Sequence, residues 1–245
     1  MKKIFNILNN GIIVNNKHIG LTNNTLKIFA MIAMFLDHLG LQIFPKIYFL
    51  RVIGRLAFPI FAYMIAEGCK YTRNRTKYLG VIATFGIIFQ IVYFVAMRSL
   101  YQGVLITFSL SIILIYLIDN FLKNKKVLNA IYILVVVGII LFANLYLPGV
   151  LKRFEFRIDY RIPGILMPVL IYYSKGKIMK LIMVSLMLLW LAFIVRGFQW
   201  YGFLTIPLLW LYNERRGKVN LKYMFYIFYP THLVLIYIID IIRHM

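Results

Sequence analysis

The sequence has a single cysteine, Cys69, and only 7 acidic residues in 245. One cysteine excludes an intramolecular disulfide, and with no sequence neighbour that would activate it, Cys69 fits a packing role better than a nucleophilic one. No zinc-binding spacing, phosphate-binding loop or nucleotide-binding glycine fingerprint occurs either. The sequence therefore predicts no metal site and no nucleotide-binding domain of the common kinds.

What the chain does have is apolar residues and positive charge. Hydrophobic residues make up 62% of it and the mean hydropathy is +0.83, whereas roughly 45–50% apolar residues are normal in a soluble domain. The formal net charge is nevertheless +21. Because the basic residues are not gathered in any soluble domain, nucleic acid is not the expected partner. The combination is typical of a multi-pass protein of the cell membrane with basic inner loops.

Apolar runs long enough to cross a bilayer, which takes about 20 residues, recur along the sequence. We predict an all-α, polytopic helical bundle with about nine transmembrane helices. The nine predicted spans are Leu26–Phe44, Phe49–Cys69, Tyr78–Met97, Val104–Leu122, Val127–Leu147, Ile162–Ser174, Ile178–Val195, Phe198–Tyr212 and Leu221–Ile242. The sixth and eighth are short, so each is either a complete span or a broken, re-entrant segment.

Basic residues are concentrated in alternate loops. If both short segments cross the membrane, 18 of the 28 Lys and Arg residues fall on one side. The positive-inside rule then predicts a cytoplasmic N-terminus and an external C-terminus. The clusters that define this side surround Lys3, Arg73, Lys125, Lys177 and Arg216. A charged loop on the opposite side, residues 152–161, is either a solvated connection or a contact for a substrate.

The first 24 residues differ from the remainder. Seven asparagines interrupt them, and no apolar core precedes a small-residue cleavage site, so they do not resemble a cleaved signal. Ile4, Phe5, Leu8 and Ile12 would line one face of a short helix at the membrane surface. We therefore predict an interfacial segment over residues 1–24 and a single transmembrane domain over residues 25–245.

Two adjacent ionisable residues, Asp37 and His38, stand inside the first predicted span. Each such side chain at bilayer depth costs roughly 2.5–3.5 kcal/mol on insertion scales. Arg51 and Arg55 lie four residues apart in the next span and so share a helix face. In the predicted topology all four belong to the outer half of the bundle. They form either a structural pairing between two helices or a catalytic group, in which His38 exchanges a proton near neutral pH.

A second histidine, His232, lies midway along the last predicted span, two residues after Pro230. Tyr229 precedes it by three residues and so lies on the same helix face. An isolated histidine in a membrane helix marks a functional site by default. The structural alternative is a hydrogen bond from His232 to a neighbouring helix.

Basic residues also follow the second span, in the stretch CKYTRNRTKY. Lys70, Arg73 and Arg75 are either an ordinary cytoplasmic anchor or a binding site for the phosphates of a cytosolic cofactor, with Glu67 beside them at the inner end of the helix. Lysine and arginine bind phosphate through charge-assisted hydrogen bonds.

Three stretches together resemble the TraX family, whose namesake is a pilin acetyltransferase of conjugative plasmids. They are LKIFAMIAMFLDHLG, LRVIGRLAFPIFAYMIAEGCKYTRNRTKYL and FYIFYPTHLVLIYI. The resemblance runs over most of the chain, and the combination of motifs is more specific than any one alone. In plan the family is similar to the broader acyltransferase-three superfamily of membrane proteins.

The resemblance implies a membrane acetyltransferase that uses acetyl-CoA, or another acyl-CoA, as co-substrate and acylates a peptide or glycan acceptor. It implies that Asp37 orients His38, which takes a proton from the acceptor. Arg51 and Arg55 would stabilise the developing oxyanion or bind an acceptor carboxylate, while Tyr229 and His232 would donate or relay a proton.

Two other readings fit the same residues. In a proton-coupled transporter or flippase, Asp37 and His38 would relay protons while the broken helices move. In a surface-assembly or secretion complex, the protein would be a non-enzymatic membrane partner. The absence of a visible inverted repeat counts against a transporter, and the ionisable residues within the spans count against a purely structural protein.

Overall fold

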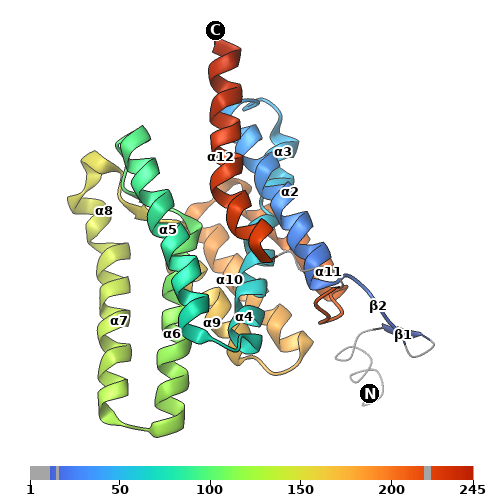
Figure 1. Ribbon diagram of the computed structural model, residues 1–245, viewed down its shortest axis with the longest axis vertical. Helices are drawn as coiled ribbons and strands as arrows, with labels where there is room; N and C mark the ends of the chain where they lie inside the picture. The colour runs from blue at the N-terminus through green and yellow to red at the C-terminus, as the bar shows by residue number, and fades with distance from the viewer. Residues whose placement is uncertain (1–11, 15–16, 218–221, 245) are drawn as a thin grey trace. The chain divides into compact units, whose positions relative to one another are not determined.

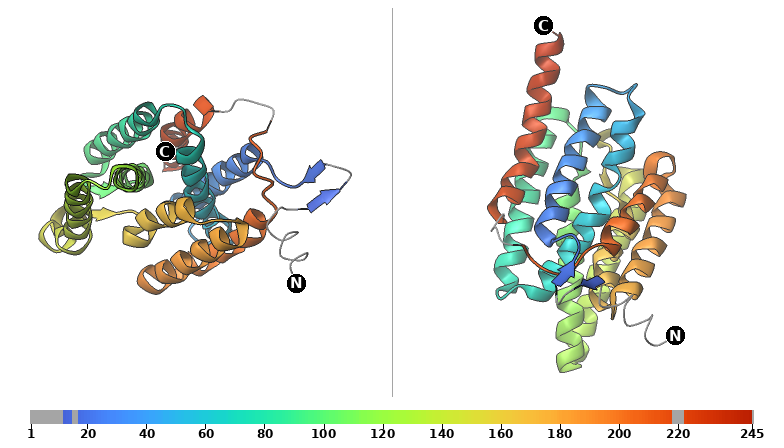
Figure 2. Two further views of the ribbon diagram at one scale, coloured as in Figure 1. Left: turned by 90° about the horizontal axis from the view of Figure 1, so that it is seen from below. Right: turned by 90° about the vertical axis from the view of Figure 1, so that its right-hand side faces the viewer.

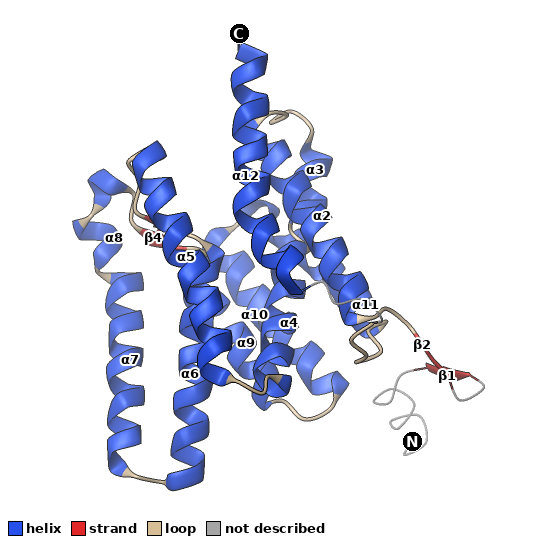
Figure 3. Cartoon of the chain, in the orientation of Figure 1, coloured by secondary structure: helices blue, strands red, loops and turns tan. Residues whose placement is uncertain are grey.

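Helices account for most of the described residues in this computed structural model, which describes residues 12–14, 17–217 and 222–244 (Figure 3). In this described part, strands are confined to two short pairs. β1 (Ile12–Val14) pairs with β2 (Lys17–Ile19) in antiparallel fashion, and β3 (Tyr101–Gln102) pairs with β4 (Arg157–Ile158) in parallel fashion. The predicted all-α class is therefore confirmed.

The chain divides into two compact units. The first combines Met1–Met64 with Ser174–Met245, and the second is Ile65–Tyr173. Helix α4 (Ala57–Tyr71) begins in the first unit and ends in the second.

The first unit is built around α2 (Asn23–Gln42), which begins after Thr22, whose hydroxyl accepts a hydrogen bond from the Thr25 amide at 3.2 Å. Helix α12 runs beside α2 in two views (Figures 1 and 2), and Arg243 near its end donates to the carbonyl oxygen of Ile43. The unit's other helices are α3 (Tyr48–Gly54), α10 (Lys177–Val195), the 3-10 helix η2 (Gly197–Leu204), α11 (Thr205–Trp210) and α12 (Lys222–His244).

Backbone hydrogen bonds join the end of α11 to the start of α2. The Leu21 amide donates to the Leu211 carbonyl at 2.8 Å, and the Asn213 amide donates to the Leu21 carbonyl at 3.0 Å. Lys177, at the start of α10, donates to the carbonyl of Tyr212 at 2.9 Å. Segments almost 200 residues apart in the sequence are thus tied into one unit.

The second unit contains a run of antiparallel helices. The carbonyl oxygen of Ile165 in α9 accepts a hydrogen bond from the buried Ser111 hydroxyl of α6 at 2.7 Å, so α6 packs against α9 as well as α5. The unit's helices are α5 (Arg75–Met97), α6 (Val104–Asn124), α7 (Val127–Leu145), α8 (Leu147–Val150), the 3-10 helix η1 (Lys152–Phe154) and α9 (Arg161–Tyr173). Figure 1 shows α6 and α7 as a hairpin.

Six helical stretches in the described chain are long and apolar enough to cross a membrane. They correspond to six of the nine predicted spans, and one of the six is Phe49–Cys69. Their length and composition indicate a multi-pass membrane protein. The two segments predicted to be short are indeed short, since α9 has 13 residues and residues 198–212 consist mainly of η2 and the six-residue α11. The last predicted span corresponds to α12. The number of crossings and their direction remain predictions.

The predicted span Phe49–Cys69 is not one continuous helix. It is divided into α3 and α4 by a turn at Arg55 and Leu56. Pro59 follows in the first turn of α4, where its missing amide proton costs no intrahelical hydrogen bond. Arg51 therefore belongs to the short helix α3 and Arg55 to the turn that follows it, so neither lies in the middle of one long helix.

The predicted interfacial helix falls largely outside the described residues, because Ile4, Phe5 and Leu8 are among those that the structure does not describe. For Ile12, however, the helix prediction is wrong, since Ile12 lies in β1. The stretch Ile12–Val14 is wholly β-branched, which favours a strand over a helix.

Residues 73 and 153 lie at opposite ends of the second unit. Arg73 precedes α5, a helix of 23 residues and so about 34 Å long. Beyond the far end of α5, the Leu100 amide donates to the carbonyl of Phe154, next to Arg153, at 2.7 Å. Since α5 is as long as the hydrocarbon core of a bilayer is thick, we expect the two arginines on opposite sides of the membrane.

Single cysteines placed at Arg73 and Arg153 in a Cys69→Ser background test this topology. A membrane-impermeant maleimide should label the cysteine at position 153 in intact cells and the cysteine at position 73 only after the cells are opened, because the basic loop is retained inside. Labelling of both positions from outside, or the reverse pattern, would overturn the predicted orientation. Cys69→Ser protein without an introduced cysteine gives the background labelling.

Candidate functional site

A buried carboxylate, Asp37, joins α2 to α3 in the first unit. Its Oδ2 atom lies 2.8 Å from Nη1 of Arg51 and also pairs with Nη2 of Arg55. Arg51 additionally donates to the backbone carbonyl of Asp37 at 3.2 Å. Only 9% of Asp37 is exposed, so the two guanidinium groups replace the water that a charged carboxylate would otherwise require. We call these three residues the charge clamp.

Close approach of the two helices makes this clamp possible. A Cβ atom added at Gly54 would overlap the Asp37 side chain, and one added at Gly40 would come within 2.8 Å of Leu50 Cβ. Glycine at both positions lets α2 and α3 pack with little separation. The carboxylate of Asp37 is therefore pressed against the backbone of α3.

Next to the clamp, two histidines from α2 and α12 face each other. The ring centroids of His38 and His232 are 5.0 Å apart, with the rings at 68° in an edge-to-face arrangement. Phe228 stacks on His232 at 4.8 Å, nearly parallel, and Tyr229 meets His232 edge-on at 5.8 Å. His232 is only 3% exposed, and Tyr229 is buried as well.

Each histidine is fixed by a carbonyl of its own helix. The Nδ1–H of His38 donates to the Met34 carbonyl, and that of His232 donates to the Phe228 carbonyl, both at 2.8 Å. A carbonyl can only accept, so Nδ1 carries the proton and Nε2 of each neutral ring keeps its lone pair. The Nε2 of His232 is buried and has no hydrogen-bond partner within the described residues. An unsatisfied buried nitrogen of this kind needs an explanation, and a catalytic role is one.

The clamp and the histidines belong to one electrostatic site, because the charges of Asp37, Arg51 and Arg55 all act on the His38 ring. Aromatic rings border it. The Arg51 guanidinium lies 5.9 Å from the centre of the Phe198 ring, which stacks on the exposed Tyr48 at 6.0 Å. Such a site combines basic nitrogens, fixed positive charge and low water content, which is suited to proton transfer and oxyanion stabilisation.

All six residues expected to share a chemical site, Asp37, His38, Arg51, Arg55, Tyr229 and His232, thus lie together in the first unit. The expected pairing within the group is different. The hydrogen bond that fixes the His38 ring goes to Met34, whereas Oδ2 of Asp37 is bound by the arginines. Asp37 therefore orients the arginines rather than the histidine ring.

The four residues expected to bind a cofactor have separate environments in the second unit. Arg75 forms an ion pair with Asp119 at 2.6 Å and lies over the Tyr116 ring at 4.9 Å. Glu67 is buried, at 4% exposure. Lys70 and Arg73 are exposed, with the Lys70 ammonium 5.3 Å from the Tyr71 ring. The Arg75 side chain is itself 37% exposed, but its guanidinium is engaged by Asp119.

Sequence reasoning missed the partner of Arg75. Asp119 of α6 accepts hydrogen bonds from Tyr172 and Tyr173 of α9 at 2.8 and 2.9 Å, in addition to its pair with Arg75. The tandem tyrosines gave no signal by themselves, since aromatic residues are common near helix ends in membrane proteins.

Metal binding is not supported among the described residues, where no group of three or more His, Cys, Asp or Glu side chains is placed to hold an ion.

Comparisons with known proteins connect this geometry to a family. The model of the TraX protein family matches residues 22–240. The probable fimbrial assembly protein FimC, serogroup H1, of Dichelobacter nodosus is 28% identical over 238 residues, covering 86% of this chain and 92% of that protein. An uncharacterized protein of Rickettsia prowazekii (strain Madrid E), RP591, is 38% identical over 66 residues, which cover 27% of this chain and 25% of that protein. No solved structure matches the chain. Because the family model covers nearly the whole sequence, including both histidines and the charge clamp, the chain belongs to the TraX protein family.

Proposed function

We propose that the protein is a membrane-embedded acetyltransferase. It moves an acetyl group from acetyl-CoA to an amine, such as the N-terminus of a pilin or another peptide, or to a sugar. Membership of the TraX family supports the reaction class, and the name of the Dichelobacter nodosus relative supports an acceptor connected with fimbrial assembly. The observation that carries the proposal is the contact of His38 with the buried His232, whose Nε2 has no partner within the described residues, beside the charge clamp.

In the proposed reaction the acceptor nitrogen or oxygen attacks the thioester carbonyl carbon. A C–N or C–O bond forms, the C–S bond breaks, and the acceptor proton passes to Nε2 of His38. The proton then returns to the leaving thiolate, through His232 or directly, to give the free thiol of CoA. Arg51 and Arg55 place positive charge where the carbonyl oxygen becomes negative.

Acetyl-CoA is proposed to reach the protein from the cytoplasmic side. Of the basic residues after the second predicted span, Lys70 and Arg73 are exposed and suited to bind its phosphates. Arg75 is committed to Asp119. We therefore assign phosphate binding to Lys70 and Arg73, and a structural role to Arg75 and to the buried Glu67.

Replacement of His38 tests the general base. His38→Gln preserves the approximate size of the side chain and its ability to hydrogen-bond Met34 but removes the titrating nitrogen. Since positioned acid–base catalysis contributes about 10²–10⁴-fold, kcat for acetyl transfer by purified protein should fall at least about a hundredfold, with little change in the KM for acetyl-CoA.

Two further histidine variants make this measurement specific. His18→Gln, which replaces a histidine that the proposed mechanism does not use, should retain full activity. His232→Gln should lose less than His38→Gln, because His232 relays the proton rather than removing it. A larger loss at His232 would exchange the two roles. Uptake of a solute into liposomes without any acetyl transfer by the unaltered protein would replace the enzyme by a transporter.

The charge clamp is tested by a double-mutant cycle. Asp37→Asn leaves two guanidinium groups without their shared carboxylate and should destabilise the protein by up to about 3 kcal/mol. Arg55→Gln added to Asp37→Asn should cost less than the two separate losses combined, with a coupling free energy of about 0.5–3 kcal/mol. Unfolding in detergent measures stability, and acetyl transfer measures function. Additive losses in stability would contradict the clamp.

Neutralising the exposed cations tests the binding of acetyl-CoA. Lys70→Gln with Arg73→Gln should raise the KM for acetyl-CoA, leaving kcat and the KM for the acceptor unchanged, because two phosphate contacts are lost. The matched control is Lys123→Gln with Lys125→Gln, which removes one cation from the last turn of α6 and one from the turn that follows. Equal effects of the two pairs, or no effect of the first, would return Lys70 and Arg73 to a role in topology alone.

A further inference from the structure

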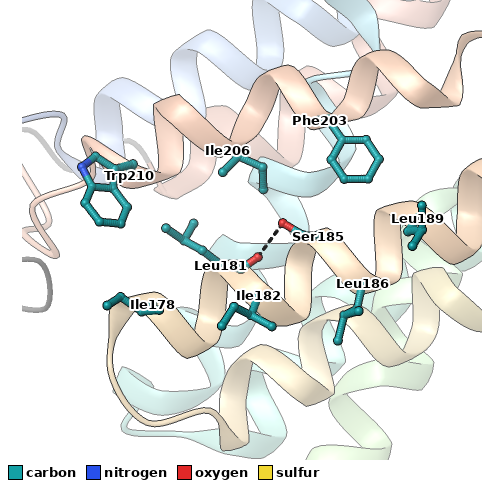
Figure 4. Close-up of a pocket in the computed structure, with 9 residues that line it drawn as sticks. All are labelled: Ile178, Leu181, Ile182, Ser185, Leu186, Leu189, Phe203, Ile206 and Trp210. Carbon is teal, nitrogen blue, oxygen red and sulfur yellow. Dashed lines mark hydrogen bonds between the residues drawn. The ribbon is translucent and has the colours of Figure 1, made fainter. Parts of the chain in front are cut away.

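An apolar groove opens along α10 in the first unit, at some distance in the sequence from the residues of the proposed reaction. Its volume is about 380 Å³, within the range of small-molecule sites. One wall belongs to α10 and the other to η2 and α11 (Figure 4). The lining residues are Ile178, Leu181, Ile182, Ser185, Leu186, Leu189, Phe203, Ile206 and Trp210.

The lining of the groove is almost entirely apolar. Apart from the Trp210 indole, its polar side chain is Ser185, which donates its hydroxyl proton to the Leu181 carbonyl one turn earlier, at 2.9 Å (Figure 4). Ile182, Leu186 and Leu189 are 44%, 47% and 38% exposed, and all three belong to a helix long and apolar enough to span a membrane. The chemistry of the lining therefore matches a hydrocarbon chain and not a sugar, a nucleotide or a charged peptide.

Basic residues lie at the Trp210 end of the groove or close to it in the sequence. The ammonium group of Lys177 lies 5.7 Å from the centre of the Trp210 ring, and Lys175, Arg215 and Arg216 are exposed nearby in the sequence. The one carboxylate in this region, Glu214, is already paired with Lys180 at 3.1 Å. Tryptophan and cations together are typical of the membrane interface. An anionic headgroup would find complementary charge here, with its chain lying in the groove.

The groove also bears on the stability of η2, which forms part of one wall. η2 is an eight-residue 3-10 helix, and 3-10 helices longer than three or four residues are uncommon because their hydrogen bonds are poorly aligned. Such a segment depends on packing for its stability. Phe203 lines the groove, while Phe198 at the other end of η2 lies over Arg51. A chain in the groove would complete the packing of η2 on one side.

From these observations we propose that the groove is a binding site for one acyl chain of an anionic phospholipid, whose phosphate lies at the Trp210 end, in the leaflet that faces the basic loops. The occupant is a structural lipid rather than a substrate of the proposed acetyl transfer. The proposal can therefore be tested without any measurement of enzymatic activity.

Tryptophan fluorescence can report directly on the groove, because Trp210 lines it. The chain has 3 tryptophans, so Trp190→Phe with Trp200→Phe leaves Trp210 as the sole emitter. Delipidated protein in detergent is titrated with phosphatidylglycerol brominated in mid-chain, and with the matching brominated phosphatidylcholine. We expect quenching by phosphatidylglycerol that saturates at stoichiometric lipid, and much weaker quenching by phosphatidylcholine at the same concentration.

Groove-filling variants distinguish a defined site from the general lipid surroundings. Ser185→Phe and Ile206→Phe fill the groove from opposite walls, so either can serve if the other fails to fold, and each should abolish saturable quenching. Ile194→Phe is the matched control, on an exposed part of α10 outside the groove, and should leave quenching unchanged. Non-saturating quenching that is equal for both lipids and all variants would overturn the proposal.

The principal competing occupant is a second copy of the chain. If a lipid fills the groove, protein that carries Leu189→Cys in the Cys69→Ser background should remain monomeric on mild oxidation. A disulfide-linked dimer together with no quenching by either lipid would overturn the lipid assignment in favour of self-association. Equal, saturable quenching by both lipids would overturn the headgroup assignment.

Discussion

The charge clamp is the interaction on which the rest of the first unit depends. A carboxylate that is 9% exposed inside a membrane helix is tolerated only with its charge compensated, and Asp37 obtains this from Arg51 and Arg55. The requirement fixes α3 against α2 and makes a side chain at Gly54 impossible without displacement of Asp37. It also determines where His38 can lie, since His38 is the next residue of the same helix. The ion pairs that join α2 to α3 therefore also supply charges that act on the His38 ring.

The histidines use a different solution to the cost of burial. Each ring is satisfied at Nδ1 by the carbonyl four residues earlier in its own helix, so neither needs a polar partner on another helix to remain in place. This local bond fixes the tautomer and leaves Nε2 as the nitrogen available for chemistry. Two helices that supply the same local arrangement then need only to approach each other. Contact between α2 and α12 brings the rings to 5.0 Å without any hydrogen bond between them being required.

Sequence patterns predicted the parts of this architecture that are local. Apolar runs indicated the long helices, and ionisable residues within those runs identified the site, because their cost in a bilayer demands a reason. Partners contributed from elsewhere could not be predicted. Nothing in the sequence joined Arg75 to Asp119, 44 residues away, or placed Phe198 over Arg51. Nor did the pattern separate α3 from α4, since the residues that flank the turn at Arg55 are as apolar as a continuous span would be. The helix prediction at Ile12 is wrong because the β-branched residues Ile12–Val14 favour a strand, although the spacing of the apolar residues up to Ile12 also fits a helix.

Within the described residues, Asp119 and His232 differ in how completely the hydrogen-bonding capacity of their own side chains is used. Asp119 accepts from Arg75, Tyr172 and Tyr173, so both of its oxygens are engaged and the cluster ties three helices of the second unit together. A substrate would have to displace one of those bonds to react there. His232 instead retains a buried nitrogen with no partner among the described residues. Leaving such a nitrogen unpaired costs stability, and a folded protein retains that cost most readily where a bound substrate removes it. This contrast supports the proposed catalytic centre between α2 and α12 and a structural role for the Arg75–Asp119 pair in the second unit.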